Sequence, residues 1–193
     1  MKKVEVMLID AHPGRSAILE QALSDAGYHI TVRTANTDKL LQQVRDAQPD
    51  VILIDIDLPD RDTLEQLSDV GQNQPRPIVM FAERSDPETT AAALRAGVSA
   101  YVVDDLNPRR LQPIMEVAIA RFREYQALRR ELEETRNRLA ERKVIDKAKG
   151  LLMAQRNLSE EEAYQTLRKL AMDRNQRIGE VARTVASLLE MLG

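Results

Sequence analysis

Few side chains in this sequence could carry out chemistry, and none of them forms a catalytic pattern. Cysteine is absent, which excludes disulfide bonds and cysteine metal sites. The two histidines, His12 and His29, have no second type of ligand at metal-binding spacing, so we interpret both as surface or structural residues. The sequence contains no Ser-His-Asp pattern, phosphate-binding loop or glycine-rich dinucleotide motif. We therefore predict that the protein is not an enzyme.

The charged residues favour a nucleic-acid partner, because the two halves of the chain differ in charge. Residues 1–106 carry 10 Lys and Arg against 18 Asp and Glu, whereas residues 107–193 carry 18 against 13. A protein with an acidic isoelectric point can still bind nucleic acid when one half of its chain is basic. The basic surplus is modest, and solvated coiled coils have similar compositions.

The first ten residues begin with a basic and then apolar pattern, as an export signal would. Glu5 and Asp10 interrupt this pattern before an apolar segment of usable length forms, so we expect no export. The absence of cysteine fits a cytoplasmic protein. The longest apolar runs are only five or six residues, far too short to cross a membrane.

Short apolar runs alternate with helical periodicity over residues 1–106. The runs predict strands at 4–9, 29–33, 50–55, 77–82 and 100–103. Helices are expected between them, at 16–26, 39–47, 62–70 and 88–96. In the first helix, the residues expected to share the apolar, buried face are Ile18, Leu19, Ala22 and Leu23. Alternating strands and helices predict a doubly wound, flavodoxin-like α/β domain with a parallel sheet.

A single long helix is predicted for residues 108–156, which contain one glycine and no proline beyond Pro113. About 45 helical residues would span roughly 65–70 Å. Apolar and small side chains recur there at three- and four-residue spacing, at Tyr125, Leu128, Leu132, Thr135 and Leu139. This seam of roughly two heptads is typical of a coiled coil. We predict that Tyr125, Leu128, Leu132 and Leu139 form a homodimer contact; the alternative is a solvated linker helix.

Two shorter helices are predicted after the long one. Ser159 and Glu162 form a capping-box pattern at the start of the first, and Asn175 is expected to cap the second. The apolar faces of the two helices consist of Ala163, Leu167, Leu170 and Ala171, and of Ile178, Val181, Ala182, Val185, Leu188, Leu189 and Leu192. Together with the end of the long helix they predict an all-α three-helix module. Met153 and Met172 are expected in its core.

Residues 8–13 and 49–59 resemble the receiver domain of response regulators. In that family, two acids after the first strand bind Mg²⁺ and an aspartate at the end of the third strand accepts a phosphoryl group. A hydroxyl after the fourth strand and a lysine after the fifth hold the phosphoryl oxygens. The resemblance assigns Asp10 to the first acid and Asp55 to the phosphoacceptor, which makes these two the candidate Mg²⁺ ligands.

Three of the family's five functional positions carry other residues. Ala11 replaces the second acid, Ala82 the hydroxyl and Asp104 the lysine. Mg²⁺ often binds one or two carboxylates plus water and phosphate, so the first loss is tolerable. Asp104, however, would place a negative charge where a phosphoryl group needs a cation. We predict a pseudo-receiver regulated without phosphorylation and without a cofactor; the alternative is a weak or unusual phosphoacceptor.

The three-helix module resembles the ANTAR domain of antiterminator regulators, whose members act on RNA hairpins and prevent transcription termination. The resemblance covers most of residues 140–193 and rests on residues 148–153, 162–164, 167–168, 171–172, 178 and 181–182. Tyr164 is the one aromatic residue of this module, so recognition would depend mainly on phosphate contacts and exposed loop bases. The candidate RNA-binding cations are Lys147, Lys149, Arg156, Arg168, Lys169, Arg174 and Arg177.

Further segments, at 76–81, 97–103, 110–114 and 140–143, are similar to nitrate-assimilation regulators of the NasT type. This resemblance implies positive control of nitrate and nitrite assimilation genes through RNA hairpins in mRNA leaders. It also implies a sensor partner of the NasS type, which holds the regulator until nitrate or nitrite binds. Composition and spacing by themselves indicate nothing about nitrogen metabolism.

We expect three parts: a receiver-like domain at 1–106, a linker coiled-coil helix at 107–139 and an ANTAR domain at 140–193. One alternative is a phosphorylation-dependent two-component response regulator that acts on DNA, which would need a basic recognition helix. In and just before the last helix, Arg177 and Arg183 stand against Glu180 and Glu190, which argues against it. Another alternative is a scaffold that uses its coiled coil alone.

Overall fold

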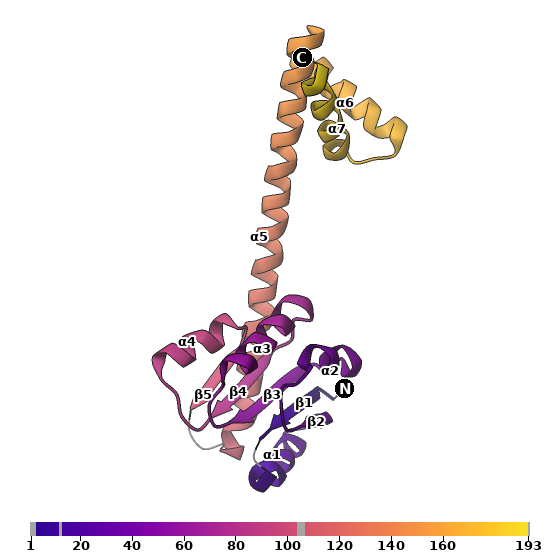
Figure 1. Ribbon diagram of the computed structural model, residues 1–193. Coiled ribbons are helices and arrows are strands. Elements are labelled where there is room, and N and C mark those ends of the chain that lie inside the picture. Colours follow the sequence, from indigo (N-terminus) through magenta and orange to yellow (C-terminus); the bar gives the residue numbers. More distant parts are fainter. Residues whose placement is uncertain (1–2, 12, 104–106, 193) are drawn as a thin grey trace. The chain divides into compact units, whose positions relative to one another are not determined.

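The apolar runs of the first half of the chain form a sheet in the computed structural model, which describes residues 3–11, 13–103 and 107–192 (Figure 1). The chain forms two structural units, residues 1–126 and 127–193. Its elements are, in chain order, β1 (Glu5–Asp10), α1 (Pro13–Asp25), β2 (His29–Thr34), α2 (Leu40–Ala47), β3 (Val51–Ile56), α3 (Arg61–Asn73), β4 (Ile78–Ala82), α4 (Pro87–Arg95), β5 (Ala100–Val103), α5 (Pro108–Arg156), α6 (Glu160–Arg174) and α7 (Ile178–Leu192).

The sheet has five parallel strands in the order β2-β1-β3-β4-β5. The central strand β3 is buried from Val51 to Asp55, whereas the edge strand β2 alternates between exposed and half-buried residues. Parallel neighbours require long crossovers, and helices supply them between successive strands. This is the doubly wound, flavodoxin-like architecture that the alternation predicts.

Each face of the sheet has its own hydrophobic core, because successive side chains of a strand point to opposite faces. On one face, Leu8 and Leu53 pack with Leu23 of α1 and Met115 of α5. The other core joins the strands to α2, α3 and α4 and includes Met7, Ile9, Ile52, Ile54, Leu40, Val44, Leu67, Val70 and Ala93. Helices therefore bury both faces of the sheet.

The end of α5 packs with α6 and α7 in the second unit. Its core consists of Ala148, Leu152, Ala163, Leu167, Ala182, Ala186 and Leu189. The predicted capping box begins α6: the Ser159 hydroxyl accepts from the Glu162 N–H at 3.3 Å, and Glu162 Oε2 accepts from the Ser159 N–H at 2.8 Å. The three-helix module is thus confirmed, together with the capping box that begins α6.

Asn175 ends α6 and does not cap α7, so its predicted role was wrong. Its φ of 51° is left-handed, and its N–H donates to the Met172 carbonyl at 3.1 Å. Asparagine tolerates this conformation better than most residues and therefore serves as a C-terminal cap. The helix α7 begins later, at Ile178.

Four apolar side chains that we expected to be buried are exposed. Ile18, Met153, Met172 and Leu188 have exposed fractions of 57%, 39%, 72% and 53%. Each lies at the flank of an apolar stripe whose centre is buried. A helix that packs against only a few neighbours covers the middle of its stripe and leaves the flanks in water.

Candidate functional site

The carboxyl edge of the sheet holds the two aspartates of the receiver resemblance. Asp10 and Asp55 end apolar runs of β1 and β3 and are partners in the strand register. Only 4% and 3% of the two residues are exposed. The Ala11 N–H donates to the Asp55 carbonyl at 3.1 Å, which continues the strand pairing past Asp10. The fold therefore brings together the two carboxylates that the sequence placed 45 residues apart.

The positions that depart from the family pattern lie at this same edge. Ala11 is exposed, and Ala82 is buried at the end of β4, where it pairs with Val103. Asp104 and His12 lie outside the described residues. Within the described part of the chain, no group of three or more His, Cys, Asp or Glu side chains could hold a metal ion. Asp10 and Asp55, the candidate Mg²⁺ ligands, are two carboxylates and do not belong to such a group.

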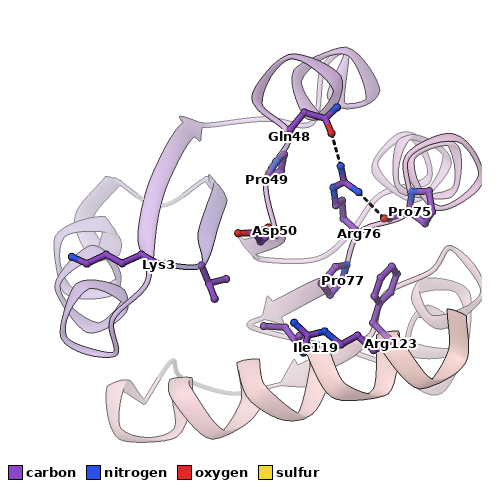
Figure 2. Close-up of a pocket in the computed structure, with 11 residues that line it drawn as sticks. Lys3, Gln48, Pro49, Asp50, Pro75, Arg76, Pro77, Ile119 and Arg123 are labelled. Carbon is purple, nitrogen blue, oxygen red and sulfur yellow. Dashed lines mark hydrogen bonds between the residues drawn. The ribbon is translucent and has the colours of Figure 1, made fainter. Parts of the chain in front are cut away.

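A pocket of about 480 Å³ lies at the opposite edge of the sheet, and our sequence reasoning did not find it (Figure 2). Arg76 lies between Gln48 and Pro75, and donates to the Gln48 side chain at 2.7 Å and to the Pro75 carbonyl at 3.3 Å. Asp50, which directly precedes β3, accepts from the Glu5 N–H at 2.9 Å. The pocket is therefore separate from the carboxylates at the other ends of these strands.

The predicted coiled-coil side chains lie exposed on α5. Tyr125, Leu128, Leu132 and Leu139 are all at least half exposed. Side chains this large and apolar usually leave water when a partner is available, and their spacing aligns them in one stripe. The structure contains one chain, so the dimer remains a proposal.

Two of the seven candidate RNA-binding cations have carboxylate partners within the second unit. Lys147 Nζ lies 2.6 Å from Glu190 Oε1. Lys149 Nζ lies 2.7 Å from Glu160 Oε1 and 2.9 Å from Asp146 Oδ1. The hydrogen bonds to Glu160 and Asp146 raise the pKa of the Lys149 ammonium group above its ordinary value. Lys149 therefore links the end of α5 to the first turn of α6, which makes it a weaker candidate for a phosphate contact.

The other five candidate cations are exposed: Arg156, Arg168, Lys169, Arg174 and Arg177. None of them forms an ion pair with another residue that the structure describes. Arg168 and Lys169 lie on α6, Arg174 is its last residue, and Arg177 directly precedes α7. These five cations can meet an external anion without first losing an ion pair to a described residue.

The second unit also contains a groove of about 400 Å³ between the end of α5, α6 and α7. Tyr164, with 39% of its surface exposed, lies at this groove together with Ile145 and Ile178. Arg138 and Arg142 line it as well, and neither was among our predicted site residues. The sequence gives one indication that Arg138 and Arg142 belong to a common site: they are four residues apart on the long helix, which places them on the same helix face.

Comparison with protein families identifies both units. The response regulator receiver domain matches residues 6–116, more than half of the chain, and the ANTAR domain matches residues 133–185. The chain belongs to the ANTAR-domain response regulators. It is therefore an antitermination response regulator, a regulatory protein and not an enzyme, as the sequence predicted.

Relatives of this response regulator include transcription regulators. The transcriptional regulatory protein PdtaR of Mycobacterium tuberculosis (strain CDC 1551 / Oshkosh) is 31% identical over 175 residues, which cover 91% of this chain and 84% of that protein. A nitrate regulatory protein of Klebsiella oxytoca is 46% identical over 65 residues, 34% of this chain and 16% of that protein. This chain is thus related over most of its length to a protein that regulates transcription.

The receiver fold of this response regulator also matches solved structures. A CheY-like receiver domain protein from Methanospirillum hungatei JF-1 superposes with a TM-score of 0.56 at 22% identity, and covers 64% of this chain and 99% of that one. This likeness confirms the predicted fold class of the first domain. In the described ranges, no helix is both long enough and apolar enough to cross a membrane.

Proposed function

We propose that this response regulator binds RNA hairpins in mRNA leaders through residues 140–193 and so prevents transcription termination. The observation that carries the proposal is a set of five exposed cations inside the ANTAR match, none of which forms an ion pair with a described residue. Lysine and arginine that replace the counterions of phosphates supply most of the affinity of such contacts. Hairpin loops also expose unpaired bases, which a small helical module can reach more easily than the edges of a duplex.

We propose further that the receiver domain transmits its signal without phosphorylation. The strand β4 next to Asp55 ends in Ala82. Alanine has no hydroxyl group that could hold a phosphoryl oxygen. In this proposal a sensor protein of the NasS type takes the place of a kinase and holds the regulator until nitrate or nitrite binds. The regulated genes are those of nitrate and nitrite assimilation. The similarity to a nitrate regulatory protein, which extends over 65 residues, supports the assignment to these genes.

We also propose a division into three working parts: the receiver-like domain at 1–106, a coiled-coil helix at 107–139 and the ANTAR domain at 140–193. The two family matches leave residues 117–132 unassigned, and Tyr125, Leu128 and Leu132 lie there. Three of the four seam residues therefore lie outside both family matches, and Leu139 lies near the start of the ANTAR match. This position supports a separate role of the seam in self-association. The regulator would then present two ANTAR domains to its RNA.

Filter binding with matched nucleic acids tests the RNA proposal. The probes are a leader RNA hairpin from upstream of a nitrate-assimilation gene and duplex DNA of the same sequence, titrated across a salt series. We expect the hairpin to bind at least roughly tenfold tighter than the duplex, with affinity that falls as salt rises. Preference for duplex DNA would support a DNA-binding response regulator instead. No binding of either probe at any salt would refute the RNA proposal and favour a scaffold.

The substitution Asp55→Asn tests control without phosphorylation. We expect hairpin affinity and nitrate induction of a leader–reporter fusion to stay within about twofold of wild type, because the amide has nearly the same volume as the carboxylate in a site that is 3% exposed. Arg168→Ala, which removes an exposed cation, should reduce induction and so demonstrates that the assay is sensitive. Loss of induction by Asp55→Asn, together with labelling of the wild-type protein by acetyl phosphate, would overturn the proposal.

A further inference from the structure

The groove between α5, α6 and α7 has the lining of a binding site for a flat ring. Its wall includes the aromatic ring of Tyr164 and two half-buried isoleucines, Ile145 and Ile178. Tyr164 is the one aromatic residue in 140–193, and 39% of its surface is exposed although it lies beside apolar neighbours. A ring with one face in a groove and the other open to water can stack on a second ring.

Each cation that lines this groove already has a carboxylate partner, which argues against a bare phosphate as its occupant. Arg138 Nη2 lies 3.9 Å from Glu134 Oε2. Arg142 Nε lies 3.9 Å from Asp146 Oδ2, and Lys149 lies between Asp146 and Glu160. Glu141, which also lines the groove, forms no ion pair with any residue in the described ranges. Its carboxylate lies against Gly179 near the start of α7, where it can accept a hydrogen bond from a neutral ligand that enters the groove.

Two cations that form no ion pair with a described residue are close in sequence to residues that line the groove. Arg168 follows Tyr164 by four residues on α6, and residues so spaced are neighbours on one helix face. Arg177 directly precedes Ile178, which lines the groove from the start of α7. A nucleotide has this same division into a neutral ring with N–H donors and an attached phosphate.

We propose that the groove binds one unpaired, amino-bearing base of an RNA loop, an inference that rests on the proposed RNA-binding function. The base stacks on Tyr164 and packs against Ile145 and Ile178. Its amino group donates to the Glu141 carboxylate, and its phosphate meets Arg168. Tyr164 thereby contributes a contact that depends on the presence of a base and releases no counterions.

The test uses fluorescence anisotropy of the full chain with a labelled leader RNA hairpin and a series of hairpins in which each loop base is replaced by an abasic site. Stacking on one aromatic ring makes Tyr164→Ala bind the parent hairpin roughly ten- to a hundredfold more weakly, with an unchanged salt dependence. Tyr164→Phe keeps the ring and stays within about threefold of wild type. One abasic hairpin should bind wild type more weakly than the parent hairpin does, by the same factor as the Tyr164→Ala substitution. Tyr164→Ala should bind this abasic hairpin and the parent hairpin equally, because the substitution has already removed the contact with that base.

Equal binding by Tyr164→Ala and wild type would overturn the nucleobase site while leaving RNA binding intact. Additive losses at every abasic position would overturn it too. If wild type binds no hairpin, the proposed function itself fails, which is a different result. Helical circular dichroism checks the fold, and Tyr164→Leu, which keeps apolar bulk without a stacking ring, serves if the alanine variant unfolds.

Discussion

The double variant Leu128→Asp/Leu132→Asp is expected to sediment as a monomer at concentrations at which the wild-type protein is a dimer. Both leucines are at least half exposed on α5 and belong to the proposed seam. In a dimer, each substitution would place an unpaired charge in the buried interface of both helices. A cost of at least about 4 kcal/mol raises the dimer dissociation constant roughly a thousandfold.

The matched control is Arg130→Asp/Asn137→Asp, which introduces two aspartates on the same helix at exposed heptad positions that face away from the seam. We expect this variant to remain dimeric. The measurement is made on the isolated regulator, because a sequestering partner could cover the same surface. An unchanged dimer mass in the leucine variant would show that the seam is not the contact, and a wild-type monomer at every concentration would refute the dimer.

The double variant Arg168→Ala/Lys169→Ala is expected to bind a leader hairpin roughly a hundredfold more weakly than wild type. Both side chains are exposed on α6, and neither has an ion-pair partner within the described part of the chain. Each charge-assisted contact contributes about 1.5 kcal/mol or more, close to tenfold in affinity. Each true phosphate contact also lowers the slope of log affinity against log salt by roughly 0.7–0.9.

Two further variants show whether the loss is specific. Arg95→Ala removes one exposed positive charge from α4 of the receiver domain and should leave affinity nearly unchanged. Lys149→Ala breaks the contacts to Asp146 and Glu160, so we expect a lower melting temperature and a smaller change in salt slope than in the Arg168 and Lys169 variants. Unchanged affinity and slope in the double variant, with its helices intact, would place the RNA-binding face elsewhere.

The architecture could be predicted from the sequence, because the patterns that encode it are local. Apolar runs such as Val51–Ile56 and the capping box at Ser159 depend on residues at most a few positions apart, and both appear in the structure as predicted. The receiver and ANTAR domains were recognisable for the same reason. Parallel pairing then requires Asp10 and Asp55 to share one edge of the sheet, so that part of the candidate site was predictable as well.

Which side chains on a given helix face meet a partner could not be predicted, because it depends on the packing of the helices. Lys147 and Lys149 look equivalent to Arg168 in sequence, yet Glu190 and Glu160 bring carboxylates to the two lysines from other helices. Such ion pairs depend on how the helices pack, and the spacing of residues along one helix does not encode that packing. Packing also left Met172 in water and opened the groove at Tyr164, because a three-helix module buries the centres of its apolar stripes and not their flanks.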